Sequence, residues 1–455
     1  MHRLARALLI AASLISPMAA QAKPVTLGVE AMRQLAFEAV TAGFAEQAFV
    51  YTDLLLQRDT KDSTALAIRA QALRALGRTE EAQVAARFAW KYAHSDNGRY
   101  GAAMAMAQVL STEGRRTAAQ LWLRRAAEVA PNARAYAIAR RDFGYVKSRN
   151  PWVFQLDASA SPSSNVNNGS SNSFMSIGGL PILFDIPPDQ QALSGFQFGL
   201  GLTGKYRFSP TAPNRQTEAR IGLMSQGVAL SGDAKDKAPD AHAQDYTYTA
   251  LEFGMAHHRG LDPAAQNVLH VTGTAGHNWY GGDDLSNYLR LSLGLDHKLA
   301  HGSSLSFGLS GDHTARLDRP IQSSDRITAS VGYTFALGAN RLSVEVEGAQ
   351  TTSDSAEVRN DAVTLSLGWK KTKPVAGLIL SGGLDLTQQV FADSRYVIGG
   401  REDDKLTAQL QVGFQNIEYM GFSPVVTMQV TQVQSNTAQN ERRNLGITLG
   451  IQSAF

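Results

Sequence analysis

Two hydrophobic periods divide the chain. From Glu30 to about residue 148, apolar residues recur every three or four positions in a segment rich in Ala, Leu, Arg, Gln and Glu, which is the pattern of amphipathic helices. From Asn150 onward the period is two, and Gly, Ser, Thr, Gln and isolated aromatics prevail. We therefore predict a multidomain α and β protein, with an all-α domain over residues 23–149 and a β domain over residues 150–455.

The helical segment contains a repeat in which an alanine follows a glycine by five residues. Its copies are Gly43 with Ala48, Gly77 with Ala82, and Gly114 with Ala119. The glycines are 34 and 37 residues apart, close to the period of about 34 residues of tetratricopeptide repeats. Glycine permits a tight turn between two helices, and alanine lets them approach closely. We predict about three tetratricopeptide-like repeats and a final helix over residues 134–147.

The β domain consists of long alternating segments. In the segment from Phe196 to Phe208, for example, even positions are mostly apolar and odd positions carry Gln, Gly, Thr, Lys and Arg. About fourteen such segments occur, and several exceed the roughly 9–11 residues that a tilted strand needs to cross a bilayer. We predict a transmembrane antiparallel β-barrel of about 14 strands. An even number of strands places both ends of the barrel sequence on the periplasmic side.

The connections between these segments alternate in length. Short turns such as 209–214, 300–303, 337–340 and 372–376 interleave with longer polar stretches at 162–193, 231–244, 314–324 and 392–404. Short turns of such barrels lie in the periplasm and long loops outside the cell. The helical domain precedes the first strand, so we expect it on the periplasmic side with the short turns.

Side chains on the polar face of the strands are candidates for the barrel lumen: Lys205, Arg207, Arg290, Asp296 and Lys298. Aromatic residues near strand ends are candidates for the girdles at the two membrane interfaces. These are Trp152, Tyr206, Phe208, Trp279, Tyr280, Tyr333, Phe335, Trp369, Tyr419 and Phe422.

Both termini carry targeting patterns. Residues 1–22 combine a basic start, an apolar run and the small-residue step Ala20-Gln21-Ala22, which predicts a cleaved signal peptide. At the other end, Thr448, Gly450 and Phe455 resemble the signal read by the barrel-assembly machinery, although Ser453 stands where an apolar residue is usual. We expect export to the outer membrane, with that machinery and outer-membrane lipid as partners.

Composition excludes several other functions. The chain has 455 residues, a net charge of +3 and no cysteine, so disulfides and thiolate metal sites are absent, and no nucleic-acid partner is indicated. The neighbours Asp312 and His313, and likewise His257 and His258, alternate along a strand and point to opposite faces, which separates them as acid/base partners. We expect no cofactor, no metal, no nucleotide site and no enzymatic activity.

Short motifs occur in order along the β domain. They are Asn150-Pro151-Trp152, then Pro162 with Ser164, Asn165, Asn167 and Asn168, then Pro424 with Ser435 and Asn436. With the repeats and the barrel, the chain resembles the surface lipoprotein assembly modulator (Slam) family. That resemblance implies an outer-membrane translocon that delivers lipoproteins, or soluble haem- or metal-acquisition proteins, from periplasm to cell surface. The repeat domain would capture the client.

Other interpretations remain open. A passive outer-membrane porin needs no repeat domain, and an exopolysaccharide exporter is expected to carry many more repeats than three. The repeats themselves could be only a spacer or plug. The apolar stretch 180–186 in the first long loop could fold into the lumen, contact a client or pack over the rim. The arginine-rich stretch 120–141 could be a solvated face or could meet an acidic segment or lipid headgroups.

Overall fold

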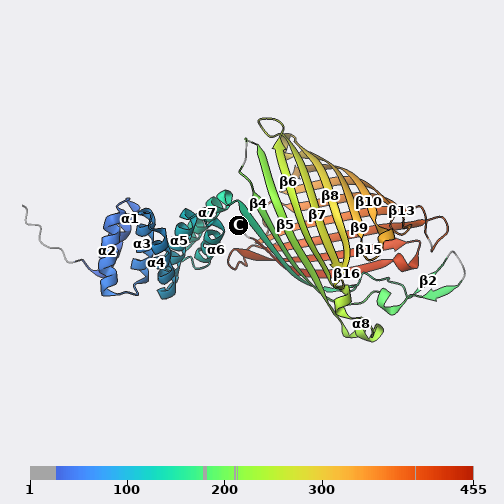
Figure 1. Cartoon of the computed structure of the whole chain (residues 1–455), viewed down its shortest axis with the longest axis horizontal. Coiled ribbons are helices and arrows are strands. Elements are labelled where there is room, and N and C mark those ends of the chain that lie inside the picture. Colours follow the sequence, from blue (N-terminus) through green and yellow to red (C-terminus); the bar gives the residue numbers. More distant parts are fainter. Residues whose placement is uncertain (1–26, 178–181, 210–211, 213, 395, 454–455) are drawn as a thin grey trace, which may run out of the picture. The chain divides into compact units, whose positions relative to one another are not determined.

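A computed structural model describes residues 27–177, 182–209, 212, 214–394 and 396–453. The residues of the proposed signal peptide, 1–22, and the terminal Phe455 lie outside this described part. Within it, seven helices precede a closed antiparallel barrel of fourteen strands (Figure 1). The predicted fold class is therefore confirmed. The chain divides into two compact units, one ending at Glu113 and the other beginning at Gly114.

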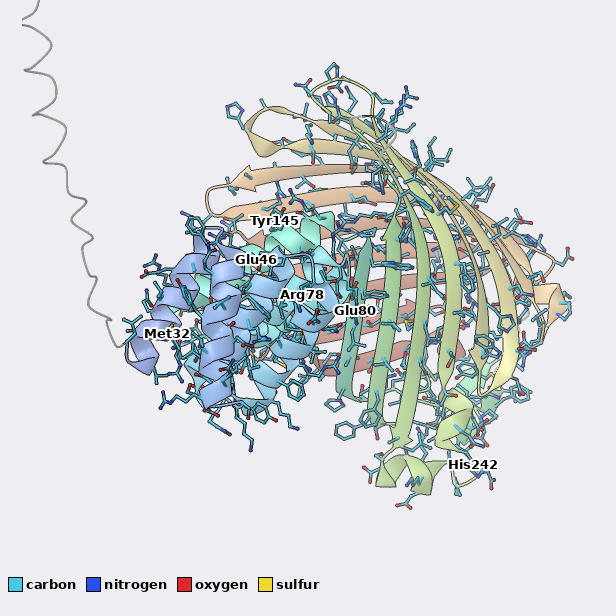
Figure 2. The ribbon with its side chains drawn as sticks, turned by 60° about the vertical axis from the view of Figure 1, so that its left-hand side comes forward. Met32, Glu46, Arg78, Glu80, Tyr145 and His242 are labelled. Atoms are coloured by element: carbon cyan, nitrogen blue, oxygen red, sulfur yellow. The ribbon has the colours of Figure 1, made fainter. Side chains whose placement is uncertain are left out.

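The first unit is a set of alanine-rich helices. Its core contains many fully buried alanines, such as Ala36, Ala48, Ala65 and Ala82, whose small side chains let helices pack closely. On its surface, Arg78 pairs with Glu81 at 2.7 Å, and Figure 2 shows Arg78 near Glu80 on these helices. The helices are α1 (Val29–Thr41), α2 (Ala45–Arg58), α3 (Ser63–Ala75), α4 (Thr79–Tyr92) and α5 (Asp96–Thr112).

The predicted Gly–Ala repeat corresponds to a repeated local geometry. Gly43, Gly77 and Gly114 all have positive φ, at 87°, 75° and 77°, a conformation that glycine adopts without steric cost. The alanine five residues after each glycine is fully buried. The other boundary of each repeat is a polar N-cap: Asp62, Ser95 and Asn132 accept bonds from the third backbone N–H that follows them.

The second unit begins with two helices that continue this pattern, α6 (Arg116–Glu128) and α7 (Ala133–Arg149). Helix α7 ends at the Asn150-Pro151 step, and the first strand starts at Trp152. A proline disfavours helical backbone in the residue before it and has no N–H to continue a helix. The change from helix to strand therefore occurs where the hydrophobic period changes from about four to two.

Fourteen strands form the barrel, each hydrogen-bonded to its neighbours in sequence, with β1 closing against β16. They are β1 (Trp152–Ser163), β4 (Gly195–Arg207), β5 (Arg215–Leu230), β6 (Tyr248–Gly260), β7 (Asn267–Tyr280), β8 (Asp283–Lys298), β9 (Ser304–Arg316), β10 (Ser324–Leu337), β11 (Asn340–Ser353), β12 (Asn360–Lys371), β13 (Leu378–Phe391), β14 (Arg401–Phe414), β15 (Phe422–Ser435) and β16 (Arg442–Ser453).

The alternation along each strand sorts side chains between lumen and exterior. On β4, Phe196, Phe198, Leu200 and Leu202 are about half exposed on the outside of the barrel, and the odd positions between them face inward. Strand pairing carries this division around the barrel, because paired residues of neighbouring strands lie on the same face. A closed barrel with such an apolar outer surface is what a bilayer requires of a spanning sheet. None of the helices in the described residues has the length and apolarity needed to span a membrane.

The two ends of the barrel differ in their connections. We call the end where β1 begins the short-turn end; it carries 208–214, 261–266, 299–303, 338–339, 372–377 and 415–421. The long-loop end carries 164–194, 231–247, 317–323, 354–359, 392–400 and 436–441, and also the two-residue turn 281–282. Aromatic contacts lie towards both ends: at the short-turn end Trp152 meets Phe154 and Tyr206, and Tyr333 stacks on Phe335, whereas Phe196 stacks on Phe198 at the long-loop end. Those at the short-turn end match the predicted girdle at that interface.

Two long loops pack against each other at the long-loop end. Val166 and Leu193 of the first loop share a small buried cluster with Leu230 and with Ala234 of helix α8 (Gly232–Lys237). The first loop also forms a hairpin of β2 (Phe174–Ser176) and β3 (Leu183–Asp185). In its apolar stretch Ile186 is buried, whereas Ile182, Leu183 and Phe184 are exposed. Three of the four apolar side chains in the described part of that stretch are therefore exposed, and Ile186 packs inside the loop.

Candidate functional site

The lumen has one wall of small side chains. The inward positions next to the β1–β16 closure are Ser159 and Ser161 on β1, Gly199 and Gly201 on β4, and Gly446 and Gly450 on β16. A cavity of about 590 Å³ lies against this wall, and its lining also includes Glu252, Tyr288, Arg290 and Asp312 from the β6–β9 side. The lumen therefore has free space beside β1 and β4.

The facing wall is charged and hydrogen-bonded. The Tyr288 hydroxyl donates to Glu252 Oε2 at 3.0 Å, and Arg290 forms an ion pair with Asp312 on the next strand. Opposite charges are thus satisfied across neighbouring strands, and the β1–β4 side of the cavity carries small side chains together with Asp157.

Two further inward histidines form a chain with an aspartate. His258 Nδ1 lies 2.6 Å from His270 Nδ1, and His270 Nε2 lies 2.9 Å from Asp296 Oδ2. These contacts join β6, β7 and β8, so they cannot be recognised from the spacing of residues in the sequence. The described residues hold no group of three or more His, Asp or Glu that could hold a metal ion.

The predicted lumen residues divide between the cavity and the barrel ends. Arg290 lines the cavity, and Asp296 belongs to the histidine chain. Arg207, at the end of β4, donates from Nη2 to the carbonyls of Lys147 at 3.1 Å and Asn150 at 2.8 Å, and so caps the C-terminus of α7. Lys205 and Lys298 are inward positions at or near the short-turn end.

Among the described residues, the pairing that closes the barrel between β1 and β16 is short. Every other pair of neighbouring barrel strands is in register over at least ten positions, as between β1 and β4. Strands β1 and β16 pair only at Ser159–Gly450, Ala160–Leu449 and Ser163–Gly446. In the described residues, positions 152–158 of β1 therefore pair with β4 alone. We call β1 residues 152–163 together with β16 residues 446–453 the seam.

Backbone geometry identifies which groups face the seam. The N–H of Arg207 donates to Pro151 O, whereas the N–H of Ser164 donates to Leu445 O. Backbone groups alternate between the two sides of an antiparallel strand, so odd residues of β1 bond to β4 and even residues face β16. Pro162 is one of these even residues and has no N–H to offer. A proline inside a sheet is typical of an edge strand.

The seam is held at the long-loop end by side chains. Ser163 Oγ donates to Asn444 Oδ1 at 2.9 Å, and the N–H of Leu445 donates to Ser164 Oγ at 3.0 Å. Together with the Ser164–Leu445 backbone bond, these contacts fasten the strands where the loops begin. The seam is thus fastened at the long-loop end, and within the described residues positions 156–158 of β1 have no partner on β16.

The asparagines of the predicted motifs hold the loop that follows β1. Asn165 exchanges two bonds of 2.8 Å with the backbone of Gly169, and Asn167 donates to the carbonyls of Asp189 and Gln191. Gly169 lies so close to the backbone of Gln191 that a Cβ there would be 2.4 Å from its carbonyl oxygen. Asn168 has a positive φ of 54° in the same turn. The motif thus builds a rigid loop at the long-loop end.

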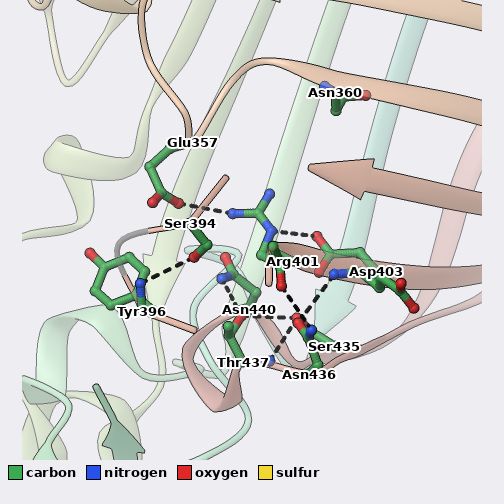
Figure 3. Close-up of polar contacts among 12 residues, drawn as sticks. Glu357, Asn360, Ser394, Tyr396, Arg401, Asp403, Ser435, Asn436, Thr437 and Asn440 are labelled. Atoms are coloured by element: carbon green, nitrogen blue, oxygen red, sulfur yellow. Dashed lines mark hydrogen bonds and ion pairs between the residues drawn. The ribbon is translucent and has the colours of Figure 1, made fainter. Parts of the chain in front are cut away.

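Ser435 and Asn436 hold the neighbouring loops in the same way (Figure 3). Asn436 bonds the carbonyl of Gly400 and the N–H of Glu402, both at 3.1 Å, and the Ser435 hydroxyl lies 2.9 Å from that of Thr437. Beside them the buried Arg401 pairs with Glu357 at 3.0 Å and Asp403 at 3.2 Å. These contacts join the loops that precede β12, β14 and β16 at the long-loop end. Pro424 lies where the β14–β15 pairing has ended.

Helices α6 and α7 are attached to the barrel turn 415–421. The buried Arg124 donates from Nη1 to the carbonyls of Met420 at 3.1 Å and Gly421 at 2.7 Å, and its guanidinium lies 4.4 Å from the centre of the Phe422 ring. Burial lowers the pKa of Arg124, and the nearby Glu418 opposes that shift. We call these contacts and those of Tyr136 described next the clasp.

Tyr136 completes the clasp from α7. Its hydroxyl donates to Glu418 Oε2 at 2.8 Å, and burial together with this bond raises the pKa of Tyr136 to about 12. The backbone N–H of Met420 also donates to Glu128 Oε2 at 2.7 Å. One member of the arginine-rich stretch is therefore a buried anchor; Arg125 and Arg134, by contrast, are exposed.

At the junction between α7 and β1, Asn150 is buried. Its side chain donates to Thr117 Oγ1 at 3.0 Å and accepts from the N–H of Trp152 at 3.2 Å. The backbone carbonyl of Pro151 accepts from Arg207, and Trp152 packs outward against Tyr206. The Asn150-Pro151-Trp152 motif thus ties the helices to β1 and β4. Of the predicted assembly signal, Thr448 and Gly450 are inward positions of β16.

Comparison with known proteins yields likenesses of fold alone. No family model matches the chain, and no curated protein does. A BenF-like porin from Pseudomonas fluorescens Pf-5 is 8% identical over 66% of this chain and 98% of its own, with a TM-score of 0.35. The outer membrane protein OmpT of Vibrio cholerae is 9% identical over 66% of this chain and 98% of its own, with a TM-score of 0.33.

The helices have a separate likeness. The type III secretion translocator chaperone SycD of Yersinia enterocolitica is 19% identical over 27% of this chain and 84% of its own, with a TM-score of 0.23. At such scores these likenesses carry no argument about function. The fold of this chain is established by its own strand pairing.

Proposed function

We propose that this protein is an outer-membrane translocon that delivers lipoproteins, or soluble haem- or metal-acquisition proteins, from the periplasm to the cell surface. The helical hairpins would capture the client in the periplasm, and the barrel would provide its route. This is also the function that the resemblance to the Slam family implies. The proposal gives the chain no catalytic role and requires no cofactor.

One observation carries this proposal: a barrel whose closing strands β1 and β16 pair at only three positions of the described residues is joined in one chain to helical hairpins of repeat geometry. Stacked helical repeats offer extended surfaces for peptides and proteins. The helix–barrel junction leads directly into β1, the strand with unpaired positions. In the proposed orientation the short turns and helices lie in the periplasm and the long loops outside.

The test is surface delivery of a client. An epitope-tagged lipoprotein encoded beside this chain's gene is expressed in cells with or without the chain, and its surface exposure is measured by protease accessibility in intact cells. We expect exposure only with the chain. If every lipoprotein or secreted protein of that gene neighbourhood is equally exposed without it, the translocon proposal fails.

A passive channel is the second candidate, and the polar cavity of about 590 Å³ favours it. A porin would conduct ions and small solutes without the helices. Single-channel conductance that is large and survives removal of residues 30–148, in a chain that exposes no client, would favour this function over translocation.

A further inference from the structure

We propose that the short-turn half of the seam is a strand-addition site, which takes an extended segment of the client polypeptide between β1 and β16. This inference rests on the proposed function and names the part of the barrel that the client contacts. A sheet edge with free N–H and C=O groups is a template for a further strand.

The free edge is short and well defined. Even residues of β1 face the seam, and Leu156 and Ala158 pair with no residue of the described part of β16, although residues 453 and 451 stand opposite them in this register. The position opposite Phe154 is residue 455, which lies outside the described residues. The N–H of Trp152 is already bonded to the Asn150 side chain. Two seam-facing residues suffice to bond an extended segment of about four residues, because only every second residue faces a given side.

Side chains on both faces of this edge suit a variable polypeptide. Outward, Phe154 and Leu156 are 56% and 50% exposed, so apolar side chains of an added strand would remain in an apolar layer. Inward, Ser159 and Gly201 border the cavity, so polar side chains of the strand would enter free space. Hydrogen bonds to the main chain bind a client segment of any sequence, and the small side chains beside the added strand leave room for its side chains.

Because the seam is fastened at the long-loop end, the client strand would enter from the short-turn end. At the long-loop end, Ser163 and Ser164 hold Asn444 and Leu445, whereas Pro162 leaves the carbonyl of Ile447 without the N–H that this register would offer. A strand can therefore add at the short-turn end, and passage of the client beyond that end requires the β1–β16 pairs to open. Further opening would proceed toward the loops one pair at a time.

Crosslinking tests the contact. A photoreactive residue replaces Leu156 at the free edge or, as the matched control, Leu291, which is equally outward on the fully paired β8. The tagged lipoprotein is halted during export by a fused, stably folded domain. We expect crosslinks from position 156 to alternate residues of one extended client segment, and none from position 291. Equal crosslinking from both positions, or crosslinks without a period of two, would overturn the strand-addition site.

A covalent lock tests the need for opening, and the natural absence of cysteine makes it specific. The variant A160C/L449C bridges a paired position of the seam, and A329C/L309C bridges the same residue types between β10 and β9. Oxidation of the first should lower client exposure by about tenfold or more, because a disulfide removes the open state, and a reductant should restore it. Oxidation of A329C/L309C should change client exposure by less than about twofold relative to the reduced variant.

The outcomes separate the two proposals. If the oxidised A160C/L449C chain exposes client as well as the unmodified protein does, the seam is not the entry site, although translocation stands. If the unmodified protein exposes no client, translocation itself fails. Recovery upon reduction shows that the variant is folded, and heat-dependent migration on a gel verifies this independently.

Discussion

At the scale of single residues, the sequence was most informative where a local backbone conformation favours one residue type. Gly43, Gly77 and Gly114 could be identified as turns because positive φ strongly favours glycine. Arg124 could not be recognised as an anchor, because its partners are backbone carbonyls near residue 420. The contact between His258 and His270 was missed for a related reason: its residues meet only through strand register.

The clasp makes a residue-scale prediction. Removing Arg124 deletes two charge-assisted hydrogen bonds and its contacts with Phe143 and Phe422. Such bonds contribute about 1.5–3 kcal/mol each. In Arg124→Ala, the free energy of local opening of α6 and α7, measured by amide hydrogen exchange, should fall by about 2 kcal/mol or more.

The neighbouring arginine provides the control for this measurement. Arg125 is exposed, and its guanidinium lies 4.5 Å from the centre of the Trp122 ring. Arg125→Ala should change the same opening free energy by less than about 0.5–1 kcal/mol, as expected of an exposed cation–π contact. Equal effects of the two substitutions would contradict the clasp.

Tyr136 gives the clasp a pH dependence. Its pKa of about 12 in the folded protein exceeds the value of about 10 in an unfolded chain. The contribution of the protonated phenol to the folded state is therefore complete below about pH 10 and is lost as the pH rises through about 12. The difference in tyrosinate absorbance between the protein and Tyr136→Phe should show this late titration. A titration near pH 10 would contradict the buried contact with Glu418.

At the scale of elements, strands and their faces could be predicted because a barrel strand alternates over its whole length. The fourteen predicted segments correspond to the fourteen barrel strands, and outward leucines such as Leu289 and Leu291 lie where the alternation places them. The short pairing of β1 with β16 among the described residues could not be predicted, because the two strands are nearly 300 residues apart and each alternates normally. Only their register reveals the three-position pairing.

Pro162 makes the element-scale prediction. Pro162→Ala would supply the missing seam-facing N–H opposite Ile447, and one net hydrogen bond contributes about 0.5–1.5 kcal/mol. Amides of β16 should become about two- to tenfold more protected from hydrogen exchange, and client exposure should slow. Pro424→Ala, at a position where the β14–β15 pairing has ended, is the control. Unchanged protection in Pro162→Ala would show that the proline does not limit the seam.

At the scale of the whole molecule, the compact units do not divide where the composition changes. The second unit begins at Gly114 and includes α6 and α7, because the clasp and Asn150 bind these helices to the barrel strands and turns. Composition changes at residue 150 because secondary structure changes there. Long-range contacts, which composition does not report, decide which helices belong to the barrel unit.

This division predicts the outcome of a truncation. A chain lacking residues 30–113 keeps every described contact of the second unit, so it should still assemble a barrel that migrates differently on a gel before and after heating. A chain lacking residues 30–149 also loses the clasp and the Asn150 junction, and should assemble less efficiently. Failure of the first deletion to form a heat-modifiable barrel would show that the units are not independent.

The most direct measurement of the central claim is client transfer across a lipid bilayer that contains this chain as its only protein. Vesicles are prepared with the full chain, and protease digests only those chains and clients outside them. We expect the tagged lipoprotein, added on the side of the helices, to become protected from protease over time, and the deletion of residues 30–113 to prevent this. Vesicles that pass small ions freely but never protect the client would contradict a translocon and identify a passive channel.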